Sequence, residues 1–183
     1  MDPIYDVIDL DGTYCRGNTL HIYIREAFRH HLRKGNILRL TRMAWHCAAR
    51  LLHLCSHASF KFGTLEAAGD DEGLMTRFVE KVRSQLSKEV IDIIENSRRR
   101  SHTVVMATAA PSFYASMIWD GPLIATPWKP GDAPVPECRA EEKLRRVLEY
   151  TSGIRPALAV TDDPAADAPL ISASARSIII TEN

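Results

Sequence analysis

Short apolar runs and longer helical patterns alternate along this 183-residue chain. The first run, from Ile4 to Leu10, predicts a buried strand, because Asp-Gly-Thr follows it as a turn. Similar runs predict strands at 103–107, 123–125, 157–161 and 177–181, and helical patterns at 112–119 and 141–150 separate some of them. Strands that alternate with helices predict an α/β fold, with a Rossmann-like parallel sheet flanked by helices.

The stretch between the first two predicted strands is almost entirely helical in pattern. Helices are expected at 20–34, 37–55 and 72–86, and Ser87 caps a fourth helix that runs to about residue 98. Residues 56–71 are mixed and give no firm assignment. About 80 residues are too many for one crossover, so we expect an all-helical cap at 17–100, inserted into a core formed by 1–16 and 101–183.

Overall composition narrows the functional class. The 23 basic and 23 acidic residues give a net charge of zero, which argues against a general nucleic-acid binder. The first residues have no basic region followed by a long apolar run, so we do not expect them to be a signal peptide. The most apolar long stretch, 37–54, carries too many charged residues to span a membrane. The four cysteines form no C-x-x-C pair, so we expect reduced thiols and a cytoplasmic protein.

Charge is nevertheless segregated along the chain. Residues 12–65 hold nine Lys or Arg residues and a single acid, Glu26. Within this stretch one set of side chains follows helical spacing and predicts a basic helix face: Arg39, Arg42, His46, Arg50, His53 and His57. The simplest interpretation is a solvated face opposite a buried apolar one. An anionic membrane surface or a large anionic ligand is the alternative partner.

Polar side chains gather where predicted strands end. They are Asp9 and Asp11, then Thr108, then the region of Lys143, and finally Asp162, Asp163 and Asp167. In open α/β sheets, ligands bind beyond the carboxyl ends of the strands, so we expect these segments to converge on one cleft. An Asp inside a buried strand is costly unless it is paired or bound to metal, which indicates a functional site.

These segments together resemble the motifs of the haloacid dehalogenase superfamily of phosphohydrolases. Asp9-Leu10-Asp11-Gly12-Thr13 resembles its first motif, and the strand ending at Thr108 resembles its second. Lys143 resembles the third-motif lysine, and the stretch from Thr161 to Leu170 resembles the acidic fourth motif. The helical insertion after the first motif and the Cys138-x-x-x-x-Lys143 run resemble the phosphoserine-phosphatase-like branch most.

The resemblance implies a role for each site residue. Asp9 would attack phosphorus and Asp11 would act as general acid and then base. Mg²⁺ would be held by the Asp9 carboxylate, the Asp11 carbonyl and a fourth-motif Asp. The substrate would meet Thr108, Ala109, Lys143 and Asn18. Taken alone, Thr108 could equally be a helix cap and Lys143 a solvated helix residue.

Three positions depart from the family pattern. Asp162 takes the place of the usual glycine in the fourth motif, so we expect Asp163 as the direct metal ligand and Asp167 outside it, with Asp162 as the alternate ligand. Ala140 also stands where this branch usually has glycine. Asn18 lies near the position where phosphoserine phosphatases have an acid, and a neutral amide cannot pair with the ammonium group of phosphoserine.

The sequence therefore predicts a Mg²⁺-dependent phosphomonoester hydrolase that works through an aspartyl-phosphate. Its expected substrate is a small or lipid-linked phosphorylated metabolite. A phosphotransferase or mutase would need the same motifs and remains an alternative. A catalytically silent module that docks through its basic cap is a second alternative, although the intact Asp9, Asp11, Thr108 and Lys143 argue against it. Dehalogenation would use Asp9 as nucleophile without needing an acid at position 11, so the presence of Asp11 argues against that reaction.

Overall fold

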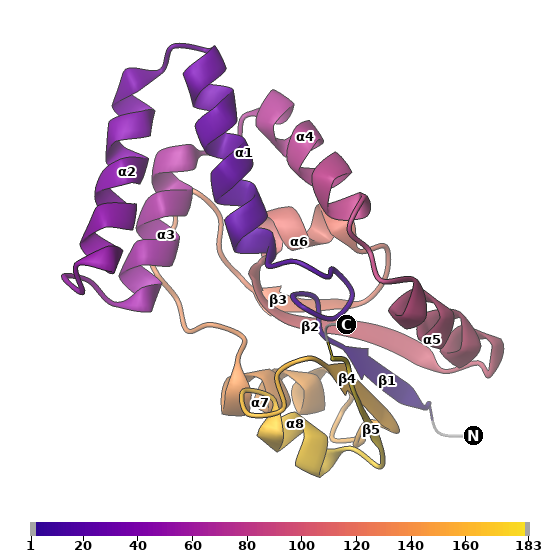
Figure 1. Ribbon diagram of the computed structural model, residues 1–183. Helices are drawn as coiled ribbons and strands as arrows, with labels where there is room; N and C mark the ends of the chain where they lie inside the picture. Colours follow the sequence, from indigo (N-terminus) through magenta and orange to yellow (C-terminus); the bar gives the residue numbers. More distant parts are fainter. Residues whose placement is uncertain (1–2, 182–183) are drawn as a thin grey trace.

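A five-stranded parallel sheet forms the centre of the molecule in the computed structural model, which describes residues 3–181 (Figure 1). The strands are β1 (Tyr5–Ile8), β2 (Thr103–Pro111), β3 (Leu123–Thr126), β4 (Leu158–Thr161) and β5 (Ser177–Ile179). Their order is β3-β2-β1-β4-β5, and every neighbouring pair is parallel. The predicted α/β fold is therefore confirmed, with β1 at the centre of the sheet.

Alternate side chains of each strand point to opposite faces of the sheet, and the central strands β2, β1 and β4 are buried on both faces. Val7 and Val105 belong to an apolar cluster that includes Val147 of α7 (Ala140–Tyr150) and Leu170 of α8 (Ala168–Ala173). Ile8 belongs to a second, larger cluster on the opposite face. The short helix α8 had no prediction from the sequence, and it follows directly after the acidic fourth segment.

Four helices build the body of the cap: α1 (Thr19–Arg33), α2 (Ile37–Leu51), α3 (His57–Ala68) and α4 (Glu72–Arg83). Helix α3 occupies most of the stretch that the sequence left unassigned. The next helix, α5 (Lys88–Arg99), contacts β2 and lies beside the sheet in Figure 1. The predicted cap range of 17–100 thus includes one helix that packs on the sheet, and we propose that the cap proper comprises α1–α4.

Aromatic side chains join the cap to the sheet layer. Tyr23 of α1 stacks on Tyr114 of α6 (Ser112–Ile118), with ring centroids 5.5 Å apart, and meets Phe78 of α4 at 5.0 Å. Phe62 of α3 meets Trp128, which follows β3, at 5.0 Å. All five rings belong to the larger apolar cluster, so cap and core share one hydrophobic core.

The predicted basic face of the second helix is wrong in two respects. Helix α2 ends at Leu51, so His53 and His57 are not part of it. Arg39 turns inward and donates to the carbonyls of Ala67 and Ala68, at the C-terminal end of α3. Of the apolar side chains that we expected to be buried opposite that face, Met43 is buried, but Trp45, Leu51 and Leu54 are exposed.

No helix within residues 3–181 is long and apolar enough to cross a membrane. Cys15, Cys47, Cys55 and Cys138 are all unpaired, as expected for reduced thiols.

Candidate active site

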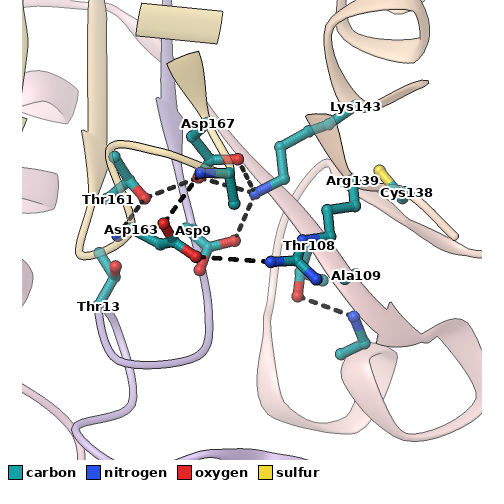
Figure 2. Close-up of polar contacts among 12 residues, drawn as sticks. Asp9, Thr13, Thr108, Ala109, Cys138, Arg139, Lys143, Thr161, Asp163 and Asp167 are labelled. Carbon is teal, nitrogen blue, oxygen red and sulfur yellow. Dashed lines mark hydrogen bonds and ion pairs between the residues drawn. The ribbon is translucent and has the colours of Figure 1, made fainter. Parts of the chain in front are cut away.

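Lys143 joins the first and fourth acidic segments at the carboxyl end of the sheet. Its ammonium lies 2.8 Å from Oδ1 of Asp9 and 2.7 Å from Oδ1 of Asp167, and Figure 2 shows it between the two carboxylates. The lysine side chain is 4% exposed, so both ion pairs are shielded from water. Lys143 stands in the first turn of α7, and this helix therefore carries the only cation that reaches Asp9 among the described residues.

Burial dominates the electrostatics of these groups. It raises the pKa of Asp9 to about 7, although Lys143 works in the opposite direction and Asp167 adds to the increase. Burial also opposes the charge on Lys143, but Asp9 and Asp167 together raise its pKa well above the usual lysine value. Lys143 is therefore a permanent cation at neutral pH, held by two carboxylates.

Asp11 is fixed by the start of the cap. Its Oδ1 accepts a hydrogen bond of 2.5 Å from the amide of Thr19, the first residue of α1, where free amides favour an anion. Burial raises the pKa of Asp11, while the Thr19 amide and the nearby Lys61 ammonium lower it. A carboxyl group with a raised pKa is suited to hold a proton near neutral pH and then to give it up.

The fourth acidic segment folds as a tight turn between β4 and α8. Thr161 donates to Asp167 Oδ2 at 2.7 Å, and its hydroxyl accepts from the amide of Asp163. Asp163 Oδ1 accepts from the amide of Ala166 at 2.9 Å, and its Oδ2 faces Arg139 at 3.7 Å (Figure 2). Asp162 turns to the first motif, where Oδ1 accepts from the Thr13 hydroxyl at 3.1 Å.

The oxygen ligands that the sequence assigned to Mg²⁺ fit that ion in chemistry. No group of three or more His, Cys, Asp or Glu side chains within residues 3–181 is arranged to hold a metal, but the expected set needs only two carboxylates and a carbonyl. Asp9 Oδ2 has no hydrogen-bond partner in this part of the chain, and Asp163 Oδ2 has only its long contact with Arg139. Each carboxylate thus keeps one oxygen for a hard cation.

Glycine at position 12 is required by this arrangement. Its φ is +72°, and a Cβ there would lie 2.0 Å from Oδ2 of Asp162. The Asp-Gly-Thr turn therefore brings the first and fourth motifs into direct contact.

Thr108 and Ala109 lie together at the bend in β2. The Thr108 hydroxyl accepts from the amide of Ala110 at 3.0 Å and keeps its own proton to donate to a ligand. Helix α6 begins at Ser112 and Pro111 precedes it, so the alternative that Thr108 caps a helix is wrong. Asn18 caps α1 through its side-chain oxygen, which accepts from the amide of His21, and it also lines the pocket beside Asp11.

A cavity of about 410 Å³ unites these groups, since Asp9, Asp11, Asn18, Thr108, Ala109, Lys143, Asp162, Asp163 and Asp167 all line it. Sequence reasoning missed Lys61, which lines the same cavity from α3. Its ammonium donates to the Ala109 carbonyl at 2.8 Å and pairs with Glu137 at 2.9 Å. Lys61 was only one of nine basic residues in its region, and nothing in its local pattern distinguished it.

Comparison with known proteins agrees with this geometry. The family model of haloacid dehalogenase-like hydrolases matches residues 7–172. The chain belongs to this family. The cavity that Asp9, Thr108, Lys143 and Asp167 line is therefore the candidate active site of a haloacid dehalogenase-like hydrolase. No curated protein matches the sequence significantly.

Several solved structures share the fold of this haloacid dehalogenase-like chain at low sequence identity. A protein of unknown function from Bordetella pertussis Tohama I is 19% identical, with a TM-score of 0.72, covering 98% of this chain and 90% of that one. A probable phosphoserine phosphatase from Vibrio cholerae is 14% identical, with a TM-score of 0.66, covering 97% and 56%. A phospho-aspartyl intermediate analogue of phosphoserine phosphatase is 12% identical, with a TM-score of 0.58, covering 98% and 87%. The resemblance to the phosphoserine-phosphatase-like branch is therefore confirmed in the fold.

Proposed function

We propose that the protein is a Mg²⁺-dependent phosphomonoester hydrolase that forms an aspartyl-phosphate on Asp9. The observation that carries this proposal is the buried Lys143 ammonium, 2.8 Å from Asp9 and 2.7 Å from Asp167, beside a carboxylate oxygen of Asp9 that no hydrogen bond occupies. Lys143 thus orients the Asp9 carboxylate through Oδ1 and leaves Oδ2 without a hydrogen bond. The solved phosphoserine phosphatase that carries a phospho-aspartyl analogue shares this fold, which supports the same chemistry here.

The chain supplies the proton transfers itself. An Asp9 oxygen forms the bond to phosphorus as the bond to the leaving oxygen breaks, and Asp11 gives its proton to that oxygen. In the second half, Asp11 takes a proton from a water molecule whose oxygen attacks phosphorus, and the bond to Asp9 breaks to release inorganic phosphate. The Thr19 amide fixes one oxygen of Asp11 and leaves the other for the proton.

Negative charge accumulates in this reaction, and several groups offset it. Lys143 and the Thr108 hydroxyl are available to the phosphate oxygens. Asp9, the Asp11 carbonyl and Asp163 would hold Mg²⁺, with Asp167 outside them and Asp162 as the alternate ligand. Bound Mg²⁺ would screen the repulsion between the Asp9 carboxylate and a phosphate dianion. Asp162 is less suited, because its carboxylate is turned to Thr13 and packs over Gly12.

The substrate class follows from the cavity lining. Lys61 and Arg139 add positive charge to the cavity lining, opposed by Glu137. Asn18 gives no anionic partner for an ammonium group, so we propose a phosphomonoester other than phosphoserine.

The experiment that tests this function measures phosphate release from an aryl phosphate with Mg²⁺ and with a chelator. Asp9→Asn should lower kcat at least 1,000-fold, because the amide has the same shape but is a poor nucleophile. Asp120→Asn, at an exposed position outside the cavity, is the matched control and should stay within twofold of the unmodified protein. Release that continues in chelator, or in Asp9→Asn, would contradict the proposal.

A further inference from the structure

The outer face of α2 is apolar along its whole length. Leu38 and Trp45 are seven residues apart, which places them on one stripe of the helix, and Leu52, the C-cap residue, follows after another seven. Ile37 and Leu51 lie on the adjacent stripe. These five side chains and Leu54 are between 67% and 80% exposed, and together they are the α2 apolar face. A 15-residue helix extends for about 22 Å, so this face is a long apolar strip rather than an isolated side chain.

Nothing in the described part of the chain covers this face. Helix α2 makes its main contacts with α1 and α3, and Figure 1 shows it at the outer edge of the molecule, away from the sheet. Its polar side chains do the inward packing: Arg39 reaches the end of α3, and His46 lies against Gly63, where a Cβ would meet the imidazole at 2.4 Å. The helix is amphipathic with its apolar side turned away from the protein, which is unusual for a helix that only packs on a core.

Unpaired positive charge lies on α2 and at the end of the helix before it. Arg33, Arg42 and Arg50 are exposed, and none of them forms an ion pair with another residue of the segment 3–181. The surrounding stretch, 12–65, has nine basic residues and one acidic residue. An apolar strip with an exposed Trp, on a helix that also carries exposed arginines such as Arg42 one turn from Trp45, matches the interface of an anionic bilayer, where apolar side chains enter the acyl boundary and arginines meet lipid phosphates.

We propose that the α2 apolar face docks the protein on the surface of anionic lipid membranes. A second copy of the chain is a poorer occupant, because pairing two such faces would bring two strongly basic regions together. The face also ends close to the catalytic cavity, since His57, three residues beyond Leu54, is one of the residues that line it. Docking does not depend on the proposed hydrolase activity, and it is tested without any substrate.

Sedimentation with vesicles provides the first test. The full chain should pellet with vesicles of 70% phosphatidylcholine and 30% phosphatidylglycerol, and should bind vesicles of pure phosphatidylcholine at least tenfold more weakly. Binding should fall as salt rises, because surface charges are screened beyond about 10 Å at 0.1 M. Tryptophan emission should shift to shorter wavelength on binding, and the shift reports Trp45, because Trp119 and Trp128 are already buried.

Two triple variants separate the contributions. Leu38→Gln, Trp45→Gln and Leu52→Gln remove the apolar strip, and Arg33→Gln, Arg42→Gln and Arg50→Gln remove the charge. All six positions are exposed, so the fold should be retained, as circular dichroism would verify. Each triple should lower the vesicle partition coefficient at least tenfold. The matched control, Tyr150→Gln with Ile179→Gln, replaces exposed apolar residues on the core and should bind as the unmodified protein does.

Three results would overturn the proposal. The first is that the unmodified chain fails to bind the anionic vesicles at 50 mM salt. The second is that the apolar triple binds as well as the unmodified protein. The third is a dimer in light scattering that the apolar triple converts to a monomer without any change in vesicle binding, which would assign the face to self-association.

Discussion

Lys143 lies between Asp9 and Asp167, with its ammonium 2.8 Å from the first and 2.7 Å from the second. Three charged groups that are nearly free of solvent contact are stable only as a set, since removing one partner leaves the others buried and uncompensated. The same lysine therefore contributes both to the fold and to the charge balance that phosphate binding requires.

Lys143→Met should lower the free energy of unfolding by about 3–5 kcal/mol, because it leaves two buried carboxylates without a cation. The measurement is urea unfolding at pH 7. Adding Asp167→Asn to Lys143→Met should recover part of this loss, because one of the uncompensated charges is then removed. Arg99→Ala, which breaks the exposed pair with Glu95, is the control and should cost less than about 1 kcal/mol. A loss below 1 kcal/mol in Lys143→Met would show that the triad does not stabilise the fold.

Asp71 provides a pH-dependent link between α1 and α4. It caps α4 by accepting from the amide of Gly73, and Lys34 lies 2.8 Å away. The Lys34 hydrogen bond lowers the pKa of Asp71 to about 2, with His30 adding to the decrease. Because the folded pKa is depressed, its stabilising contribution is present above pH 4 and is lost as pH falls toward 2. Asp71→Asn should therefore lower the unfolding midpoint in urea at pH 6, and the difference should shrink steadily below pH 4. A difference that is equal at pH 6 and pH 3 would contradict this origin.

Lys61 connects the cap to the core at the mouth of the cavity. Its ammonium contacts the Ala109 carbonyl and Glu137, two groups of the core. Lys61→Gln should raise KM for an aryl phosphate about tenfold and change kcat less than threefold, because Lys61 is close to the substrate's position but is not among the groups that transfer protons. Lys81→Gln, an exposed cap lysine outside this cavity, is the control. A fall in kcat as large as that in KM would instead assign Lys61 to the chemical step.

Ala140 has a φ of +51°, a conformation that favours glycine, at the position where the family resemblance led us to expect one. Ala140→Gly should raise the free energy of unfolding by about 0.5–1 kcal/mol, since the left-handed conformation costs an L-residue about 1–2 kcal/mol and glycine loses some of that gain through its flexible unfolded state. Ala44→Gly, inside exposed helix α2, should have the opposite sign and lower it by about 1 kcal/mol. The melting temperature should rise in Ala140→Gly and fall in Ala44→Gly. Shifts of the same sign in both variants would contradict the prediction.

Much of the fold could be predicted because it depends on local pattern. The strands β1, β2 and β4 are short buried runs, and the segment Asp9 to Thr13 after β1 joins three later segments in an order that resembles one family. Helix α3 escaped prediction because its apolar residues are mixed around the helix, so no stripe marks one buried side. Lys61 could not be identified either, since it reaches the cavity only through the packing of α3 against the core.

Which side of α2 is buried could not be predicted from the sequence either. Periodicity separated Arg39 and His46 from the apolar residues of this helix, but periodicity alone does not say which side is buried. We assumed that the apolar side was inside. The contacts of Arg39 with the end of α3 and of His46 with Gly63 reverse that assignment, and these are relationships between helices that no local pattern encodes.

The most direct test of the aspartyl-phosphate needs no knowledge of the substrate. If Asp9 is the nucleophile, inorganic phosphate itself can react in reverse, forming the acyl phosphate on Asp9 and releasing water, and hydrolysis then returns phosphate with an oxygen from solvent. Phosphate labelled with ¹⁸O should therefore lose its label in the presence of the protein and Mg²⁺, as followed by mass spectrometry, and should keep it with Asp9→Asn or with a chelator. The account predicts exchange that depends on Asp9; exchange at the same rate in Asp9→Asn, or no exchange by a protein that hydrolyses aryl phosphates, would contradict it.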